Sequence, residues 1–367
     1  MDEDRDARGR TGSRAADVSD VVPAAAPKPR RTITWRTAIG GGLGLAVIVC
    51  TFVFVLPRVA NYRDVWAVVK ELSWSQVALL LGATALNLAT YAPPWQAALP
   101  GLRFRQAFVL TQASTASTLV LPGGAAVGMG VSFGMLRGWG FTGKPVTLAL
   151  AVTGIWNQFA MLAFPIVAVA LLTLSKEQNA LLQTVAFIGV AIFVVAAAGF
   201  AVGLTSDRLA NWVGETAAAI TTRVLRIVRR GPVKWGGPSF VAFRHEAVGL
   251  LKRRWHVLTL AVLAGQLTVF LVLLVSLRVL DVSAGEVSLI EAFAAWSLVR
   301  LLGSIPITPG GIGIVEVGLT TALVGFGGNN AEVVAGVLVY RFLTIVPTLL
   351  LGLACAATYR RQRPAVS

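Results

Sequence analysis

The feature that most constrains this chain is a series of apolar runs, several of them close to the length of a membrane-spanning helix. The hydrocarbon core of a bilayer is ~30 Å thick, and about 20 helical residues cross it. The 367 residues are 56% hydrophobic and only 13% charged, whereas a soluble domain is usually about 25% charged. We therefore expect an all-α polytopic membrane protein.

The apolar runs predict six full spans and two pairs of shorter segments. The segment 106–121 is only ~24 Å long as a helix, somewhat short of the bilayer core, and this favours a re-entrant half-helix. The expected full spans are 37–57, 74–92, 145–173, 180–203, 256–280 and 333–358, and the shorter pairs are 106–121 with 126–138 and 287–306 with 312–327.

Each shorter pair is interrupted by a Pro-Gly-Gly turn, formed by Pro122, Gly123 and Gly124 in one and by Pro309, Gly310 and Gly311 in the other. Proline removes a backbone donor and glycine allows unusual φ angles, so one helix should stop here and another begin. Broken helices in membranes commonly line a substrate path. A kinked hairpin with a purely structural role is the alternative.

The surroundings of the two turns match, which predicts an internal repeat. Gln106-Ala107-Phe108 precedes the first turn much as Glu291-Ala292-Phe293 precedes the second. We assign repeat one to about 74–173 and repeat two to about 256–358, within a single transmembrane domain at 34–358.

The basic residues favour a topology in which the two repeats are inverted. The formal net charge is +15, and the positive charges cluster in loops and tails. Positive-inside topology and anionic lipid headgroups account for these clusters, so nucleic-acid binding is a poor explanation. With the N-terminal tail inside, every strongly basic segment falls on the inner side and the repeats point in opposite directions. Inverted repeats with broken helices are typical of alternating-access transporters.

The segments outside the spans are polar and mostly basic. Residues 1–33 are expected to be a disordered cytoplasmic tail, and 359–367 a basic cytoplasmic tail. In the insertion 205–255, apolar residues recur at helical spacing beside arginines. This pattern predicts a basic amphipathic helix on the inner leaflet.

Three charged residues, Arg300, Glu316 and Arg341, fall within apolar segments of the second repeat. Isolated charges there are costly, so they should pair with one another or face a polar cavity. In one interpretation Arg300 and Arg341 clamp a phosphate headgroup and Glu316 orients an arginine. In the other, an internal salt bridge holds the hairpin to the last span. Both interpretations remain open.

Polar residues also occur in the first repeat. Asn157 and Gln158 lie near the centre of the span 145–173. The segment 106–121 has a stripe of small polar residues, for which tight helix packing is the more usual explanation and a polar cavity lining the less common one. The stripe consists of Thr111, Ser114, Thr115, Ser117 and Thr118.

Residues typical of catalytic or metal sites are scarce. Neither Cys50 and Cys355 nor the two histidines, His245 and His256, have a spacing that predicts a metal site or a disulfide framework. The sequence has no Gly-x-x-x-x-Gly-Lys-Ser/Thr phosphate-binding loop and no cluster suited to acid–base chemistry. We expect no enzyme activity, no catalytic residue, no metal and no cofactor.

The second turn also has a family resemblance. The stretch Ile305-Pro306-Ile307-Thr308-Pro309-Gly310-Gly311-Ile312-Gly313-Ile314-Val315-Glu316, followed by Val339-Tyr340-Arg341-Phe342, resembles the lysylphosphatidylglycerol synthase transmembrane (flippase-like) family. This is the membrane portion of the multiple peptide resistance factor. The resemblance covers roughly residues 35–358 and implies a lipid flippase fold. It implies substrate-path roles for Pro309, Gly310, Gly311, Gly313, Glu316 and Arg341.

The chain departs from the family pattern in two respects. Ala125, Ala126 and Met129 replace a more polar turn in the first repeat, which leaves no acid opposite Glu316. The sequence ends at Ser367 without room for the soluble aminoacyl-transferase domain of some members, so lipid synthesis is not expected.

The expected function is a flippase that moves a phospholipid or a polyprenyl-phosphate-linked lipid between leaflets of a bacterial plasma membrane, with both termini cytoplasmic. The headgroup would pass between the two broken hairpins near the midplane. The main alternative is a small-solute or ion-coupled secondary transporter of the same architecture. The expected partners are anionic or zwitterionic phospholipids or polyprenyl phosphate, and a homo-oligomer or a separate lipid-modifying enzyme is left open.

Overall fold

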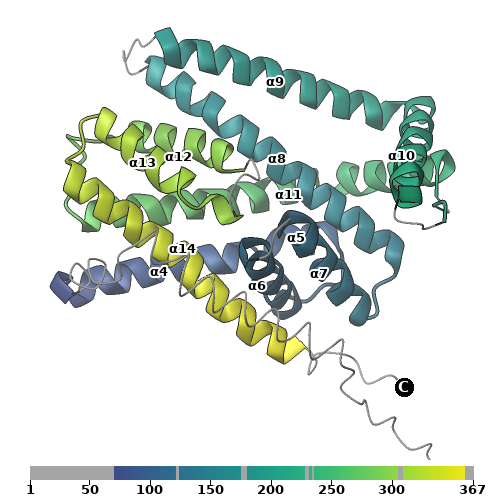
Figure 1. Cartoon of the computed structure of the whole chain (residues 1–367), viewed down its shortest axis with the longest axis horizontal. Helices are drawn as coiled ribbons and strands as arrows, with labels where there is room; N and C mark the ends of the chain where they lie inside the picture. Colours follow the sequence, from purple (N-terminus) through teal and green to yellow (C-terminus); the bar gives the residue numbers. More distant parts are fainter. Residues whose placement is uncertain are drawn as a thin grey trace, which may run out of the picture. The chain divides into compact units, whose positions relative to one another are not determined.

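The computed structural model describes residues 70–120, 124–174, 180–227, 231–233, 235–304 and 309–359. The predicted tail 1–33, the predicted first span 37–57, Pro122, Gly123 and residues 360–367 lie outside this part of the chain. The helices are α4 (Trp74–Thr90), α5 (Pro93–Ala98), α6 (Phe104–Val120), α7 (Gly124–Gly138), α8 (Gly143–Leu174), α9 (Ala180–Thr205), α10 (Asp207–Ile227), α11 (Gly237–Val279), α12 (Leu289–Gly303), the 3₁₀ turn η2 (Pro309–Gly311), α13 (Ile314–Gly325) and α14 (Asn330–Thr358) (Figure 1).

The helix lengths and hydropathies confirm that the chain is an all-α polytopic membrane protein. Five segments of the described chain are long and apolar enough to cross a bilayer: Trp74–Ala98, Gly143–Thr173, Phe187–Thr205, Gly237–Val279 and Asn330–Cys355. The predicted spans 74–92, 145–173, 180–203 and 333–358 correspond to α4, α8, α9 and α14.

The helix that contains the fifth predicted span begins earlier in the structure than the predicted start near residue 256. Helix α11 runs unbroken from Gly237 to Val279, over 43 residues, which is ~65 Å and about twice the thickness of the bilayer core. The charged run Lys252-Arg253-Arg254 lies inside this helix and is exposed. Lysine and arginine are good helix formers. The charge cluster therefore marks a change in hydropathy along the helix, and the helix itself begins much earlier.

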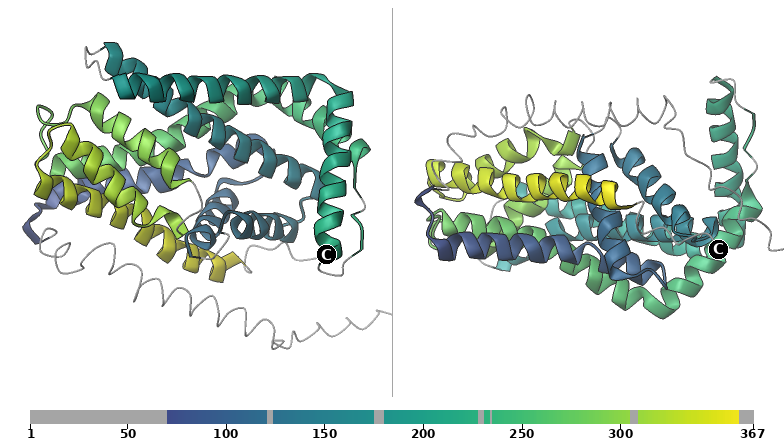
Figure 2. Two further views of the ribbon diagram at one scale, coloured as in Figure 1. Left: turned by 45° about the horizontal axis from the view of Figure 1, so that its top comes forward. Right: turned by 90° about the horizontal axis from the view of Figure 1, so that it is seen from below.

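Helix α10 is the expected amphipathic helix, and it packs against α11 through small residues. Ala210 and Gly214 are buried, and a Cβ added to Gly214 would lie 2.8 Å from Gly237 Cα of α11. Trp212 and Ile220 are 62% and 60% exposed. These two large apolar side chains thus lie on the exposed face of α10. Figure 2 shows α10 turning away from the end of α9.

Helix α6 packs against α7, and α12 packs against α13 beside the η2 turn. These helices have 17, 15, 15 and 12 residues, or about 26, 22, 22 and 18 Å, and each is shorter than the bilayer core. These lengths fit half-helices.

The first helices of the two hairpins also begin alike. Gln106 Oε1 accepts a hydrogen bond from Arg103 N at 3.1 Å, and Glu291 Oε2 accepts one from Ser288 N at 2.6 Å. Each side chain reaches back three residues to the start of its helix, as in a capping box. Both the repeat and its inversion stay predictions.

Glycines bring the two halves of the chain into close contact. A Cβ added to Gly352 of α14 would lie 2.3 Å from Ala116 Cβ of α6, and one added to Gly310 would lie 2.9 Å from Leu119 Cδ2. Helix α14 therefore packs tightly on α6, and the second turn lies against the end of that helix (Figures 1 and 2). Small residues commonly permit such contacts between membrane helices.

Candidate functional site

Two adjoining cavities lie where the hairpins meet α8, α11 and α14. The smaller one is about 250 Å³ and the larger one about 430 Å³. Residues of α12, η2, α13 and α14 line much of the smaller cavity, and α6, α7, α8 and α11 contribute most of the larger one. The two share the lining residues Tyr91, Thr115, Met161 and Arg300.

Arg341 of α14 holds the second turn to the last helix. Its Nε donates to Oε1 of Glu316 on α13, forming an ion pair, and its Nη2 donates to the carbonyl oxygen of Gly310 at 3.0 Å. Both side chains are close to nine-tenths buried. This ion pair therefore links α13, α14 and the turn, as the structural interpretation of these charges predicted.

The glycines of the turn place Glu316 in position. Gly310, Gly311 and Gly313 have backbone φ angles of +62°, +67° and +85°. Residues other than glycine rarely adopt such positive φ angles. This path brings the Gly313 N–H within 2.6 Å of Glu316 Oε2. The carboxylate also lies in the first turn of α13, where the helix dipole favours an anion. Both carboxylate oxygens therefore have protein partners.

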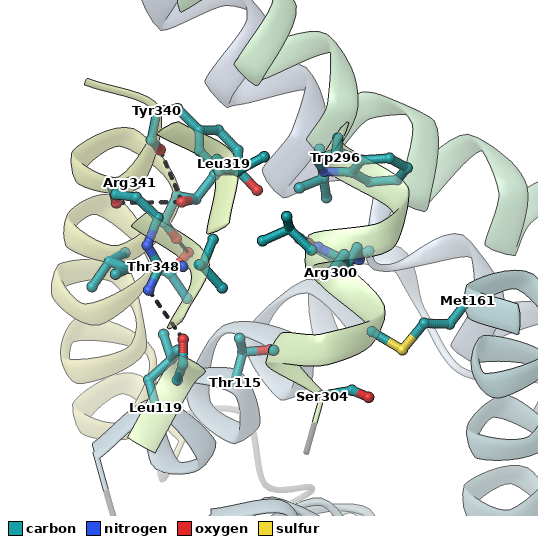
Figure 3. Close-up of a pocket in the computed structure, with 18 residues that line it drawn as sticks. Thr115, Leu119, Met161, Trp296, Arg300, Ser304, Leu319, Tyr340, Arg341 and Thr348 are labelled. Atoms are coloured by element: carbon teal, nitrogen blue, oxygen red, sulfur yellow. Dashed lines mark hydrogen bonds between the residues drawn. The ribbon is translucent and has the colours of Figure 1, made fainter. Parts of the chain in front are cut away.

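Arg300 of α12 lines both cavities but differs from Arg341 in its partners. Its Nε is buried and has no hydrogen-bond partner within the described part of the chain, where Arg300 also forms no ion pair. Its Cζ lies 5.4 Å from the ring centroid of Trp296, a cation–π contact. Figure 3 shows Arg300 and Arg341 reaching the smaller cavity from different helices. A buried polar group without a partner is costly, so Arg300 is suited to bind an anion.

An aromatic cluster supports the wall behind Arg300. Trp296 is 1% exposed, and its ring lies 5.5 Å from that of Phe164, 5.5 Å from that of Phe270 and 5.8 Å from that of Phe293, measured between centroids. These side chains come from α8, α11 and α12. The cation is thus attached to a tightly packed part of the core.

Several neutral polar groups line the larger cavity, beside Arg300 and apolar side chains. Gln266 Nε2 of α11 donates to Asn157 Oδ1 of α8 at 2.8 Å, and Gln158 also lines the cavity. Gln266 Oε1 is buried and has no partner among the described residues. The lining residues with a hydroxyl group are Tyr91, Thr111, Ser114, Thr115, Thr118, Ser132 and Thr153.

The small polar stripe of α6 has both roles considered for it. Thr118 packs against α7, since a Cβ on Gly128 would lie 2.2 Å from Thr118 Oγ1. Thr118 and Ser114 also line the larger cavity. Their hydroxyls donate to backbone carbonyls of the preceding turn, at 3.0 and 3.2 Å, so their oxygen lone pairs remain able to accept.

The predicted site residues separate into groups. Arg300, Gly310 and Arg341 line the smaller cavity, and Asn157 and Gln158 line the larger one together with Arg300. Glu316 lines a separate groove between α13 and α14. Gly311 and Gly313 shape the second turn, and Pro309 begins η2. Gly124 begins α7, and Pro122 and Gly123 lie outside the described residues.

Sequence reasoning did not identify Gln266, Trp296 or Tyr91 as lining residues. Gln266 could have been found, because it is a lone amide in the apolar run 256–280 and such residues usually face the protein interior. The two aromatic residues have no comparable signal. Among the described residues, no group of three or more His, Cys, Asp or Glu side chains is placed to hold a metal ion.

Comparison with known proteins agrees with the resemblance of the second turn. No curated protein matches the chain. Residues 41–352 match the family described as "Lysylphosphatidylglycerol synthase TM region". The match includes both Pro-Gly-Gly turns, both cavities and most of α14. Because it extends over most of the chain, this protein belongs to the family of lysylphosphatidylglycerol synthase transmembrane regions.

Proposed function

We propose that this protein is a lipid translocase, which moves a phospholipid or a polyprenyl-phosphate-linked lipid between leaflets of a bacterial plasma membrane. The headgroup would pass between the α6–α7 and α12–α13 hairpins. The observation that supports this most directly is Arg300 at the junction of two cavities, a cation whose buried Nε has no hydrogen-bond partner among the described residues. Ionisable residues inside membrane proteins commonly mark substrate pathways.

The sizes of the cavities suit a headgroup. Pockets for small ligands usually measure about 300–1,000 Å³, and these cavities measure about 250 and 430 Å³. A headgroup of this size would enter while the acyl chains stay in the bilayer. Arginine binds phosphate through a planar, bidentate group of N–H donors, and Arg300 would hold the phosphate.

The roles of the two arginines differ in this proposal. Arg341 already has the Glu316 carboxylate and the Gly310 carbonyl as partners, so it maintains the shape of the turn. Arg300 then contacts the phosphate, and the predicted clamp is reduced to one arginine. Membership of a family named for a phospholipid synthase favours a lipid over a small solute. The small-solute transporter remains the second candidate on architecture alone.

The test is a leaflet-accessibility assay with purified protein in liposomes that contain a fluorescent phospholipid. We expect Arg300→Gln to slow translocation at least about tenfold, because a charge-assisted hydrogen bond contributes about 1.5–3 kcal/mol. Arg300→Lys should retain part of the activity. Arg105→Gln is the matched control, since Arg105 is exposed near the start of α6 and lines neither cavity.

Wild-type rates for Arg300→Gln would exclude the proposed phosphate contact. If neither phospholipids nor polyprenyl phosphates move in wild-type vesicles, the translocase proposal fails. Transport of a soluble anion under the same conditions would then support the small-solute candidate.

A further inference from the structure

The charges that line the two cavities are all positive. Among the described residues, the charged residues that line the smaller cavity are Arg300 and Arg341. The charged residue that lines the larger cavity is Arg300. No aspartate or glutamate of the described chain lines either cavity. Among the described residues, a positively charged headgroup would therefore meet arginine in these cavities and no carboxylate.

The nearest acid, Glu316, is not available to such a group. Its Oε1 accepts from Arg341 Nε and its Oε2 from Gly313 N. Its accessible side faces a different groove, shared with Val317, Thr320 and Val334. Glu316 thus compensates Arg341, while Arg300 has no compensating carboxylate in the part of the chain that the structure describes.

The rest of the larger cavity is lined by neutral hydrogen-bonding groups together with apolar side chains such as Met129, Leu150 and Val262. Amides of α8 and α11 and hydroxyls of α6, α7 and α8 line it. Gln266 is 7% exposed, and its Oε1 has no partner among the described residues. A buried acceptor of this kind requires a donor from a ligand or from water. A hydroxyl group both donates and accepts, and it can satisfy Gln266 and the neighbouring hydroxyl oxygens together.

We propose that the translocated lipid has an uncharged polyhydroxyl headgroup, such as glycerol, inositol or a sugar, attached through a phosphate. Arg300 binds the phosphate, and the larger cavity binds the hydroxyl groups. An amine-bearing headgroup, including a lysyl ester, is disfavoured because its ammonium group would be buried near Arg300 without a counter-charge. This inference rests on the proposed translocase function and specifies its substrate class.

The test compares lipids in the same liposome assay, each labelled on an acyl chain. The polyol arms are phosphatidylglycerol, phosphatidylinositol and a polyprenyl-phosphate-linked hexose, and the amine arms are phosphatidylethanolamine and lysylphosphatidylglycerol. We expect at least one polyol lipid to move about tenfold faster than either amine lipid. The three polyol arms distinguish a glycerol, an inositol and a lipid-linked sugar.

Two serines of α6 provide a matched pair of variants. Ser114 and Ser117 each donate to a backbone carbonyl of α6, at 3.2 and 2.8 Å, but only Ser114 lines the larger cavity. Ser114→Ala should slow the preferred polyol lipid several-fold, by the loss of one neutral hydrogen bond, and Ser117→Ala should not.

Gln266→Glu tests the charge argument, because it adds a carboxylate to the larger cavity. The rate ratio of an amine lipid to a polyol lipid, measured in the same vesicles, should rise at least about tenfold. Amine lipids that move as fast as polyol lipids in the wild type, or an unchanged ratio in Gln266→Glu, would overturn the headgroup inference and leave the translocase intact. No movement of any lipid would instead reject the translocase itself.

Discussion

At the level of single residues, two arginines line the same cavity with different partners. Arg341 is paired with Glu316, and both side chains are close to nine-tenths buried. Removing one charge of a buried pair leaves the other without compensation, at a cost of about 3–5 kcal/mol. We therefore expect Glu316→Gln to lower the thermal unfolding temperature of the detergent-solubilised protein clearly. Headgroup binding by the unaltered Arg300 is a separate property of the site.

Two further variants serve as controls for this stability prediction. Arg300→Gln should leave the unfolding temperature nearly unchanged, since Arg300 has no carboxylate partner in the described part of the chain. The double substitution Glu316→Gln with Arg341→Gln should recover part of the loss, because no unpaired charge stays buried. An unfolding temperature for Glu316→Gln equal to that of the wild type would mean that the pair is dispensable for stability.

At the level of elements, the α6–α7 hairpin depends on the small size of Gly128. A Cβ at this position would lie 2.2 Å from Thr118 Oγ1 and 3.0 Å from Ser114 O. Gly130 of the same helix has no atom within 4 Å of its added Cβ. Gly128→Ala should therefore destabilise the protein by about 1–3 kcal/mol through overpacking. Gly130→Ala should be neutral or slightly stabilising, because alanine favours helices.

The comparison of the two glycines in α7 is made by thermal unfolding in one detergent. Both substitutions add one methyl group to the same helix, so helix propensity and hydropathy change alike. Only the contact with α6 differs between them. If both variants unfold at the same temperature, α7 is not closely packed on α6.

At the level of the whole molecule, the distribution of basic residues predicts that the two halves are inverted in the membrane. The loop after α7 contains Thr142, and the loop after α11 contains Ala284; both residues are exposed. Positive-inside topology predicts the first loop in the cytoplasm and the second outside. Thr142→Cys should react with a membrane-impermeant maleimide only from the inner side, and Ala284→Cys only from the outer side. Reaction of both from the same side would exclude the inverted arrangement.

This labelling requires a background without Cys50 and Cys355. Cys355 is buried in α14, so its replacement by alanine needs a check by the lipid translocation assay. An unmodified background without any labelled band is the control. The experiment also tests whether Arg137 and Lys144, which flank the first loop, lie on the cytoplasmic side as their charge predicts.

The sequence by itself determined the class of the molecule, four of its spans and the second Pro-Gly-Gly turn. These features depend on neighbouring residues: hydropathy over about 20 positions predicts a span, and proline and glycine interrupt a helix locally. The costly charges Arg300, Glu316 and Arg341 were recognisable for the same reason. The start of α11 was not recognisable from the sequence, because an exposed charge cluster changes the local hydropathy without ending a helix.

Only the tertiary structure decided which polar groups meet. Glu316 and Arg341 are 25 residues apart in sequence, and Asn157 and Gln266 are 109 apart. Whether such residues pair depends on how helices from both halves pack, through contacts such as that of Gly352 with α6. A pattern of single residues contains no such distance. Packing therefore assigned Glu316 to Arg341, whereas Arg300 has no carboxylate partner among the residues that the structure describes.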